Sequence, residues 1–311
     1  MGWGRAYFAV QAVAGAAWWV AVFTIPLVRE LTLGSLDARL VAAADIPLFV
    51  VASALAATLP IRAARPAAIV ATAWTALVAI AMALFATVTT EAGWGVLIMA
   101  AATGCSALAL ALLLWGRIPT RWIVAGPFAF RPARATATTR MLGALISAQI
   151  AVFWGLFLVV GPLVIRALER RWRLALELSA SAALAITVVG AIVFVLAAAL
   201  GLWSSASMAI VGRGTPLPSA MANHLVVAGP YRLVRNPMAV AGIVQGAAVG
   251  LVLGSWLVVA YAVVGSVIWN YAVRPHEEAD LERRFGDEFR AYRDRVRCWV
   301  PRIPARTVST T

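Results

Sequence analysis

Long apolar stretches alternate with short polar segments along this chain of 311 residues. Alanine, leucine and valine dominate the apolar stretches, and none shows the strict apolar–polar alternation of a membrane β-strand. A run of roughly 20 apolar residues forms a helix long enough to cross a bilayer. The pattern predicts eight such helices, at about 6–28, 41–60, 67–88, 93–115, 141–165, 174–203, 238–253 and 255–273. The last two are short and joined only by Gly254, which predicts a tight helical hairpin.

Composition supports this interpretation. Hydrophobic residues make up 63% of the chain and charged residues 13%, and the mean hydropathy is +0.89. These values lie far above those of soluble domains, so we expect an all-α, polytopic integral membrane protein. A charged segment after the hairpin predicts a cytoplasmic amphipathic helix. The chain divides into an N-terminal transmembrane region, 1–170, whose role stays open, and a C-terminal region, 171–311, which holds the most polar segments.

The arginines predict an orientation. All 26 basic residues are arginine, and the formal net charge is +13. With eight spans and a cytoplasmic N-terminus, most arginines fall in cytoplasmic segments, as the positive-inside rule requires. We therefore expect a multi-pass protein, located in a bacterial plasma membrane, with its C-terminus in the cytoplasm. Segment 166–173 is an exception, because this topology places its four arginines on the outer side. Either the segment lies among lipid headgroups, or the number of spans is wrong by one.

The same composition disfavours several functions. The arginines are spread over segments beside the membrane, which is typical of contact with anionic lipid and not of nucleic-acid binding. The two cysteines, Cys105 and Cys298, and the two histidines, His224 and His276, form no cluster with metal-ligand spacing, so we expect no metal site. Asp45, near the start of the second span, is a candidate functional group because ionisable residues are costly inside a membrane.

One polar segment, GPYRLVRNPMA at 229–239, stands between two apolar stretches. Pro237 suits the first turn of the helix that follows, and Asn236 suits its N-cap. Arg232 and Arg235 add positive charge beside a helix end that is already positive, which is favourable when an anion is shared between them. The segment therefore predicts a carboxylate or phosphate site, and the alternative is that both arginines face lipid headgroups.

A second polar segment, 270–302, follows the hairpin. It contains the pair Glu277 and Glu278, then a break at Phe285–Gly286, then an amphipathic helix on which Phe289, Tyr292 and Val296 share a face. The short hairpin places both polar segments at the cytoplasmic surface. Together they offer arginines, glutamates and aromatic rings, which suit S-adenosylmethionine, a ligand with an amino acid moiety, a cation and a flat base.

The sequence GPYRLVRNPM, followed by RPHEEADLERRFGDEFRAY, resembles the C-terminal core of the isoprenylcysteine carboxyl methyltransferase family. This family of membrane enzymes includes phospholipid N-methyltransferases and bacterial thiol methyltransferases, and the resemblance covers about residues 195–302. It implies S-adenosylmethionine as cofactor and a lipid or isoprenoid-like acceptor that arrives from the bilayer. The cofactor-binding residues that it implies are Tyr231, Arg235, Asn236, Pro237, Arg274, Glu277, Glu278, Phe285 and Tyr292.

The resemblance leaves the catalytic residues open, with Arg274, Glu278 and His224 as candidates. Many members of the family have histidine in place of Asn236 and tyrosine in place of Ala239, which leaves the acceptor open as well. A thiolate or carboxylate acceptor needs positioning and exclusion of water. An amine must also lose a proton, to which His224 or Glu278 could contribute, although His224 also fits an ordinary loop histidine.

Two other functions are compatible with the sequence. A membrane sterol-type reductase that binds NADPH has a similar C-terminal pattern, but the glutamate pair disfavours a dinucleotide phosphate. The non-enzymatic alternative is a transporter or a lipid-binding scaffold. A transporter would show buried charges or broken helices in matching halves of the chain, whereas here the polar groups gather near one end. The sequence leaves open the methyl acceptor, the role of the N-terminal helices and the oligomeric state.

Overall fold

The computed structural model describes residues 2–125, 129–134, 136, 138–215 and 220–301. In this part of the chain, seven helices are long and apolar enough to cross a membrane. An eighth apolar helix, α10 (Pro237–Leu253), is shorter. The expected all-α, polytopic membrane architecture is therefore confirmed, with eight apolar helices at the expected places in the chain.

The chain packs into two compact units, each described here separately. The first unit contains Met1–Pro119 and Ala167–Ala175, and the second contains Thr120–Arg166 and Leu176–Thr311. These units are defined by packing alone. The functional division at residue 170 stays a prediction, because packing does not test which residues serve a common function.

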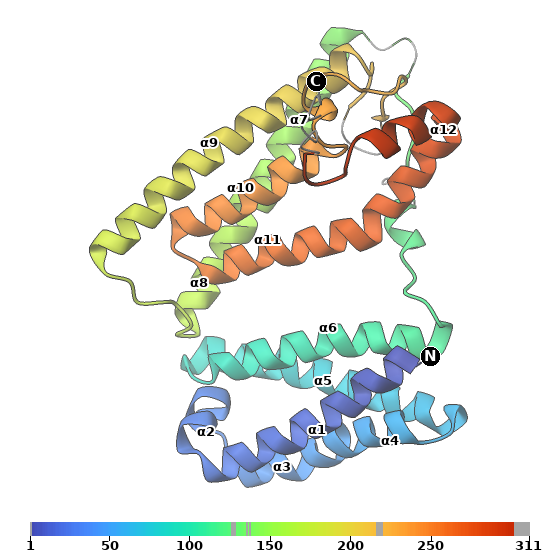
Figure 1. Cartoon of the computed structure of the whole chain (residues 1–311). Helices are drawn as coiled ribbons and strands as arrows, with labels where there is room; N and C mark the ends of the chain where they lie inside the picture. Colours follow the sequence, from blue (N-terminus) through green and yellow to red (C-terminus); the bar gives the residue numbers. More distant parts are fainter. Residues whose placement is uncertain (1, 126–128, 135, 137, 216–219, 302–311) are drawn as a thin grey trace, which may run out of the picture. The chain divides into compact units, whose positions relative to one another are not determined.

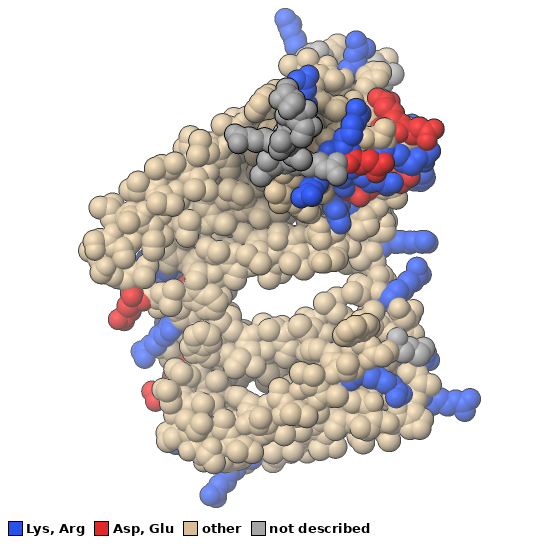
Figure 2. All heavy atoms as spheres, in the orientation of Figure 1, with Lys and Arg blue, Asp and Glu red and all other residues tan. Residues whose placement is uncertain are grey.

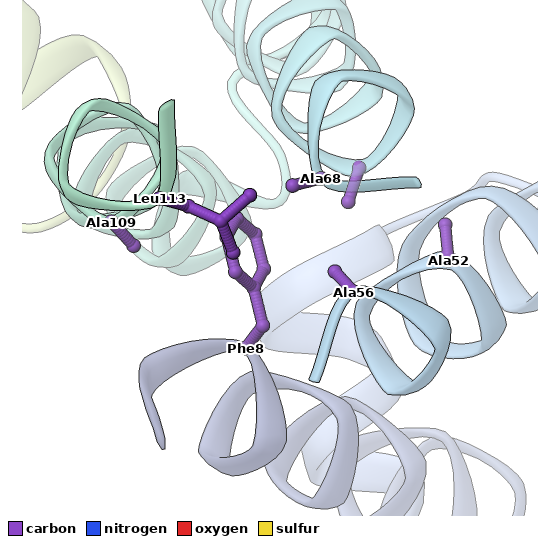
Figure 3. Packing of buried hydrophobic residues seen from close by; sticks show 7 residues of the cluster. Phe8, Ala52, Ala56, Ala68, Ala109 and Leu113 are labelled. Atoms are coloured by element: carbon purple, nitrogen blue, oxygen red, sulfur yellow. The ribbon is translucent and has the colours of Figure 1, made fainter. Parts of the chain in front are cut away.

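The first unit is a bundle of membrane helices. It contains α1 (Gly2–Thr24), α2 (Pro26–Leu33), α5 (Ile61–Thr89) and α6 (Gly93–Trp115). Between α2 and α5, one continuous span consists of α3 (Ala38–Asp45), the π-helical η1 (Ile46–Val51) and α4 (Ala52–Thr58). Phe8 packs among alanines of the neighbouring helices, as Figure 3 shows. Such small residues allow membrane helices to approach closely.

The arginine-rich segment at the end of the fifth span has specific partners in the structure. Arg171 donates to the carbonyl oxygens of Thr87 at 2.6 Å and Val88 at 2.9 Å, near the end of α5 where helix carbonyls lack partners. Arg166 donates to the carbonyl oxygen of Gly254 at 3.0 Å. These arginines therefore bind the exposed carbonyls of helix ends in addition to any contact with lipid headgroups.

The start of the sixth span differs from the expectation. The helix was expected from residue 174, but α9 (Ala180–Ile210) begins six residues later. The Ser179 side chain accepts a hydrogen bond from the Ala182 amide and caps the helix there. A side-chain cap satisfies one of the free amides of the first turn, so it sets the start of the helix more strongly than the apolar pattern does.

The second unit carries the two polar segments. One continuous span consists of α7 (Thr139–Phe153), the π-helical η4 (Trp154–Val160) and α8 (Gly161–Arg171), of which the part up to Arg166 belongs to this unit. Helices α9 and α10 follow. The last span begins with α11 (Trp256–Ile268) and continues through the π-helical η7 (Trp269–Val273) into α12 (Arg274–Arg295). Figure 1 shows α9, α10 and α11 side by side. Glycines allow this close approach, since a Cβ at Gly190 of α9 would lie 2.8 Å from the Cβ of Leu251.

The predicted hairpin is confirmed between α10 and α11. Gly254 ends α10 with a φ of +58°, a conformation that glycine adopts without strain. Ser255 caps α11 by accepting a hydrogen bond from the Val258 amide at 3.2 Å. The sharp turn returns the chain along α10, so the start of α10 and the end of α11 lie at the same end of this unit.

The surface agrees with a membrane location. Large apolar side chains are widely exposed, as with Leu184 and Leu196, each 66% exposed. In Figure 2 a dense mixed group of acidic and basic side chains lies where α12 lies in Figure 1, and the other charged side chains shown are scattered. The described part of the chain is that of an integral, multi-pass membrane protein.

Candidate functional site

The N-terminus of α10 forms the first side of the site. The Asn236 side chain accepts a hydrogen bond from the Ala239 amide at 3.1 Å, and Pro237 occupies the first turn. The predicted N-cap is therefore confirmed. A single 3-10 turn, η6 (Gly229–Arg232), leads into it. Gly229 has a φ of +58°, and a Cβ there would lie 2.6 Å from Ser207 Oγ, so glycine is required for this turn to pack on α9.

Helix α12 forms the second side. Gly286 adopts a non-helical conformation, with φ 50° and ψ −122°, and the helix kinks there. The predicted break at Phe285–Gly286 is confirmed. Beyond the kink, Phe289 and Tyr292 are buried, and the Tyr292 hydroxyl donates to the carbonyl oxygen of Tyr231 at 2.6 Å. The kink therefore folds the end of α12 back onto the segment before α10.

The two sides meet through a cluster of charged and polar groups. Arg235 Nη2 donates to Glu278 Oε1 at 2.8 Å, and Arg274 Nη1 lies 3.8 Å from the same oxygen. The Asn236 side-chain amide donates to Glu277 Oε2 at 3.3 Å. Residues from the two polar segments are thus in direct contact, as the hairpin geometry predicts. We call Arg235, Asn236, Arg274, Glu277 and Glu278 the polar cluster.

A third side, which the sequence did not indicate, comes from the segment after α12. The Arg235 amide donates to the carbonyl oxygen of Arg297 at 2.9 Å, and the Asn236 amide contacts that of Cys298 at 3.4 Å. Trp299 Nε1 donates to the Asn270 side chain at 2.9 Å and holds this segment against η7. The apolar residues at 298–300, which interrupt an arginine-rich tail, are the feature of the sequence that could have indicated a packed segment here.

The two arginines of the first polar segment differ in their surroundings. Arg232 is exposed, as expected for contact with headgroups or solvent. Arg235 is partly buried and donates to Glu278 and to the carbonyl oxygens of Arg293 and Val296. The anion beside Arg235 is therefore supplied by the chain itself. Its Nε atom is buried and has no hydrogen-bond partner in the described part of the chain.

Burial changes the protonation of groups around the cluster. It raises the pKa of Glu277 to about 7, assisted by the neighbouring negative charge of Glu278 and opposed by the hydrogen bond from Asn236. Burial also raises the pKa of the Tyr231 hydroxyl and of the Cys298 thiol. Tyr231 and Cys298 are therefore neutral at physiological pH, while Glu277 changes its charge in the physiological range.

The remaining candidates lie at the edge of the site. The Phe285 ring is partly exposed, with the Arg284 guanidinium 5.0 Å from its centroid. Arg284 also donates to the carbonyl oxygen of Ala222 and links α12 to the loop that holds His224. His224 is exposed, and no side-chain contact with the polar cluster is present among the described residues. His276 contacts Thr120 Oγ1 at 2.9 Å.

The donor set favours an organic ligand with charges of both signs. Among the described residues, no three or more histidine, cysteine, aspartate or glutamate side chains are grouped so that they could hold a metal ion. The cluster instead combines two carboxylates, two guanidinium groups and a capped helix N-terminus. Carboxylates bind cations, and guanidinium groups bind carboxylates in a fixed geometry.

Comparison with known proteins finds one family over this part of the chain. The phospholipid methyltransferase family matches residues 185–288, from α9 into the second half of α12. This match confirms the resemblance to membrane methyltransferases of the isoprenylcysteine carboxyl methyltransferase type. No curated protein and no solved structure matches the chain. The matched residues include the whole polar cluster.

Proposed function

We propose that this protein is an S-adenosylmethionine-dependent methyltransferase of the membrane, acting on a lipidic or membrane-partitioning acceptor through a carboxylate, thiol or amine. The observation that carries the proposal is that the phospholipid methyltransferase match, 185–288, contains the polar cluster. The apolar helices around the cluster support an acceptor that enters from the bilayer.

The chemistry of the polar cluster fits this cofactor. S-adenosylmethionine carries a carboxylate, an ammonium group, a sulfonium and an adenine. Glu277 and Glu278 are suited to the cationic part, and Arg274 to the carboxylate. The buried Nε of Arg235, which has no hydrogen-bond partner among the described residues, is a further donor at the site. The partly exposed ring of Phe285 provides an apolar face for the adenine.

When bound, S-adenosylmethionine would supply an electrophilic methyl group to the acceptor. The chain's task is to hold the two reacting atoms in line and to exclude water. Asn236 and Arg235 orient the two glutamates for this purpose. Tyr231 and Tyr292 act as scaffold, because both are buried and joined by a hydrogen bond.

The catalytic candidates separate by their surroundings. Glu278 accepts from Arg235 and lies beside Arg274, so we assign it to positioning. His224 is exposed and away from the cluster's contacts, which disfavours it as a base. If the acceptor is an amine, Glu277 is the better proton acceptor, because burial raises its pKa to about 7.

The proposed orientation places the polar cluster and the C-terminus in the cytoplasm, where S-adenosylmethionine is made. It is supported by the arginine distribution of the sequence and by the hairpin, which returns the chain to the side of the polar cluster. We place the protein in a bacterial plasma membrane. The acceptor is a membrane lipid or an isoprenoid-like molecule.

Calorimetry on the full-length protein in lipid nanodiscs tests the proposal. S-adenosylmethionine and its demethylated product are titrated beside NADPH, with Glu277→Gln as the test variant. Glu288→Gln is the matched control, because Glu288 is exposed on the same helix. We expect micromolar binding of both adenosyl ligands, weakened at least about tenfold in Glu277→Gln, which is a loss of about 1.4 kcal/mol, and unchanged in the control.

The other outcomes are equally informative. Binding of NADPH without the adenosyl ligands would replace the proposal with a membrane reductase. Binding of none of them would favour a lipid-binding or transport protein. If the adenosyl ligands bind, incubation with labelled cofactor and extracted membrane lipids identifies the acceptor by transfer of label into the lipid fraction.

A further inference from the structure

The first unit contains a cavity that the proposed methyltransferase function does not use. Its volume is about 250 Å³, and it lies between α1, α6 and the span that contains η1. Most of its lining is apolar, and Asp45 is the charged residue among those that line it. The volume is slightly below the roughly 300 Å³ at which small-molecule pockets begin, so the cavity suits the head of an amphiphile.

Asp45 is held in place by two tryptophans. Trp19 Nε1 donates to Asp45 Oδ2 at 2.9 Å, and Trp74 Nε1 donates to Asp45 Oδ1 at 2.7 Å. Each oxygen thus accepts from an indole, which fixes the orientation of the carboxyl group. Asp45 is 5% exposed, and no arginine of the described residues forms an ion pair with it.

A charge in this place is costly without a partner. Asp45 is the eighth residue of the span Ala38–Thr58 and lies about 10 Å along the helix axis from its start, at 1.5 Å per residue. Buried charges in proteins are paired or bind ions, and ionisable groups inside a membrane mark ligand or ion pathways. A cationic ligand is therefore the partner that an ionised Asp45 lacks in the described part of the chain.

The rest of the cavity has the features of a cation site. The rings of Tyr7, Trp18 and Phe49 line it, and aromatic faces attract cationic groups, quaternary ammonium above all. Directly after Asp45 the helix widens into the π-helical η1, a conformation found often at functional sites.

The apolar lining indicates how a ligand enters. Val10 of α1 is 65% exposed and Ile98 of α6 is 46% exposed, and both line the cavity. An apolar chain attached to the bound group can therefore extend past Val10 and Ile98 over an apolar surface.

We propose that this cavity binds an amphiphilic ammonium compound, with the cationic nitrogen beside Asp45 and its apolar chain directed out between α1 and α6. The site is distinct from the polar cluster of the second unit. It goes beyond the proposed methyltransferase function and does not depend on it.

Binding of octyltrimethylammonium to the full-length protein in nanodiscs tests this proposal, with 1-octanol and octanoate as neutral and anionic probes of the same chain length. We expect the ammonium probe to bind at least about tenfold more tightly than 1-octanol, after correction for partition into empty nanodiscs. Asp45→Asn should remove this preference. Glu30→Gln, an exposed carboxylate in the same unit, is the matched control and should preserve it.

A second variant covers the case in which Asp45→Asn fails to fold. Ala14 is exposed and lines the cavity, so Ala14→Phe fills its mouth and leaves the buried polar groups in place. This variant should lose ammonium binding and keep the helical circular dichroism and elution volume of the parent protein. Equal binding of the three probes, or a preference unchanged in both variants, would overturn the proposal.

Discussion

Arg235 and Glu278 lie 43 positions apart in the chain, yet their side chains form an ion pair of 2.8 Å between Arg235 Nη2 and Glu278 Oε1. The pair connects the start of α10 with α12 and depends on the hairpin between them. Arg235 also binds two carbonyl oxygens of the segment that follows Phe289 and Tyr292. One side chain therefore holds together all three sides of the site.

This arrangement predicts a large effect for Arg235→Ala. The substitution leaves Glu278 and two carbonyl groups without their donor, and loss of the donor to such partly buried acceptors costs about 1–3 kcal/mol of folding free energy. Arg235→Lys should recover only part of this, because a lysine ammonium cannot reach several acceptors in the geometry of a guanidinium. Thermal unfolding in detergent measures the effect.

Arg232→Ala is the control for Arg235→Ala, since Arg232 lies three residues away and is exposed. It removes the same charge from the same segment and should leave the melting temperature unchanged. An equal decrease in both variants would show that local charge, and not the contacts of Arg235, stabilises the site.

The raised pKa of Glu277 predicts that the stability of the folded protein depends on pH. Burial raises its pKa from the ordinary 4.5 to about 7, so between these values the folded protein binds more protons than the unfolded chain. The contribution of Glu277 to the free energy of unfolding is therefore fully present below pH 4.5 and is lost as the pH rises through about 7. Thermal unfolding of the ligand-free protein should show this loss, and Glu277→Gln should remove it.

The affinity for S-adenosylmethionine should change with pH in the opposite direction, increasing as the pH rises. If Glu277 binds the cationic part of S-adenosylmethionine, the ionised carboxylate is required, and affinity falls by up to about tenfold per pH unit below pH 7. Calorimetry at several pH values measures this slope. A slope that persists in Glu277→Gln would assign the titration to another group.

Asn236 has two functions that substitution can separate. Its side chain caps α10 through the Ala239 amide and donates to Glu277. Asn236→Ala loses both contacts, and the lost cap alone costs about 1 kcal/mol. Asn236→Asp keeps the cap but places a second carboxylate beside Glu277, which raises the pKa of Glu277 further.

The two variants of Asn236 should therefore separate in their pH profiles. In Asn236→Asp, the loss of cofactor affinity at low pH should move to a higher pH, while thermal stability decreases less than in Asn236→Ala. Identical binding profiles for Asn236→Asp and the parent protein would show that the contact with Glu277 has no part in cofactor binding.

Substitution of Gly286 tests whether the kink in α12 is needed for stability and cofactor binding. Its φ of 50° and ψ of −122° form a conformation that residues with a side chain avoid, at a cost of about 1–3 kcal/mol. A Cβ there would meet no atom within 4 Å, so Gly286→Ala acts through the backbone alone. Thermal unfolding should show destabilisation, and cofactor affinity should fall because the end of α12 is displaced.

Gly104→Ala is the matched control for the kink. A Cβ at Gly104 also meets no atom within 4 Å, but this glycine lies inside the regular helix α6. Alanine is favoured over glycine in a helix, so this variant should be neutral or stabilising. Destabilisation of equal size in both variants would show that the conformation of Gly286 is not the cause.

The sequence by itself determined the elements of this protein. Apolar runs long enough to span a bilayer give the helices, Asn236 and Pro237 give the start of α10, and Gly254 gives the hairpin. These features depend on near neighbours, because helix length, capping and turns are set within a few residues. The predicted start of α9 at residue 174 is wrong, because the apolar pattern begins before the Ser179 cap that starts the helix.

Only the tertiary structure decided which groups meet. The pairing of Arg235 with Glu278, the contribution of the segment at Cys298 and the cavity beside Asp45 each join positions far apart in the chain. The sequence marked Asp45 as a charge inside a span, but the tryptophans that bind it come from two other helices. Such contacts depend on how whole helices pack, and no local pattern encodes the partner of a side chain across a bundle.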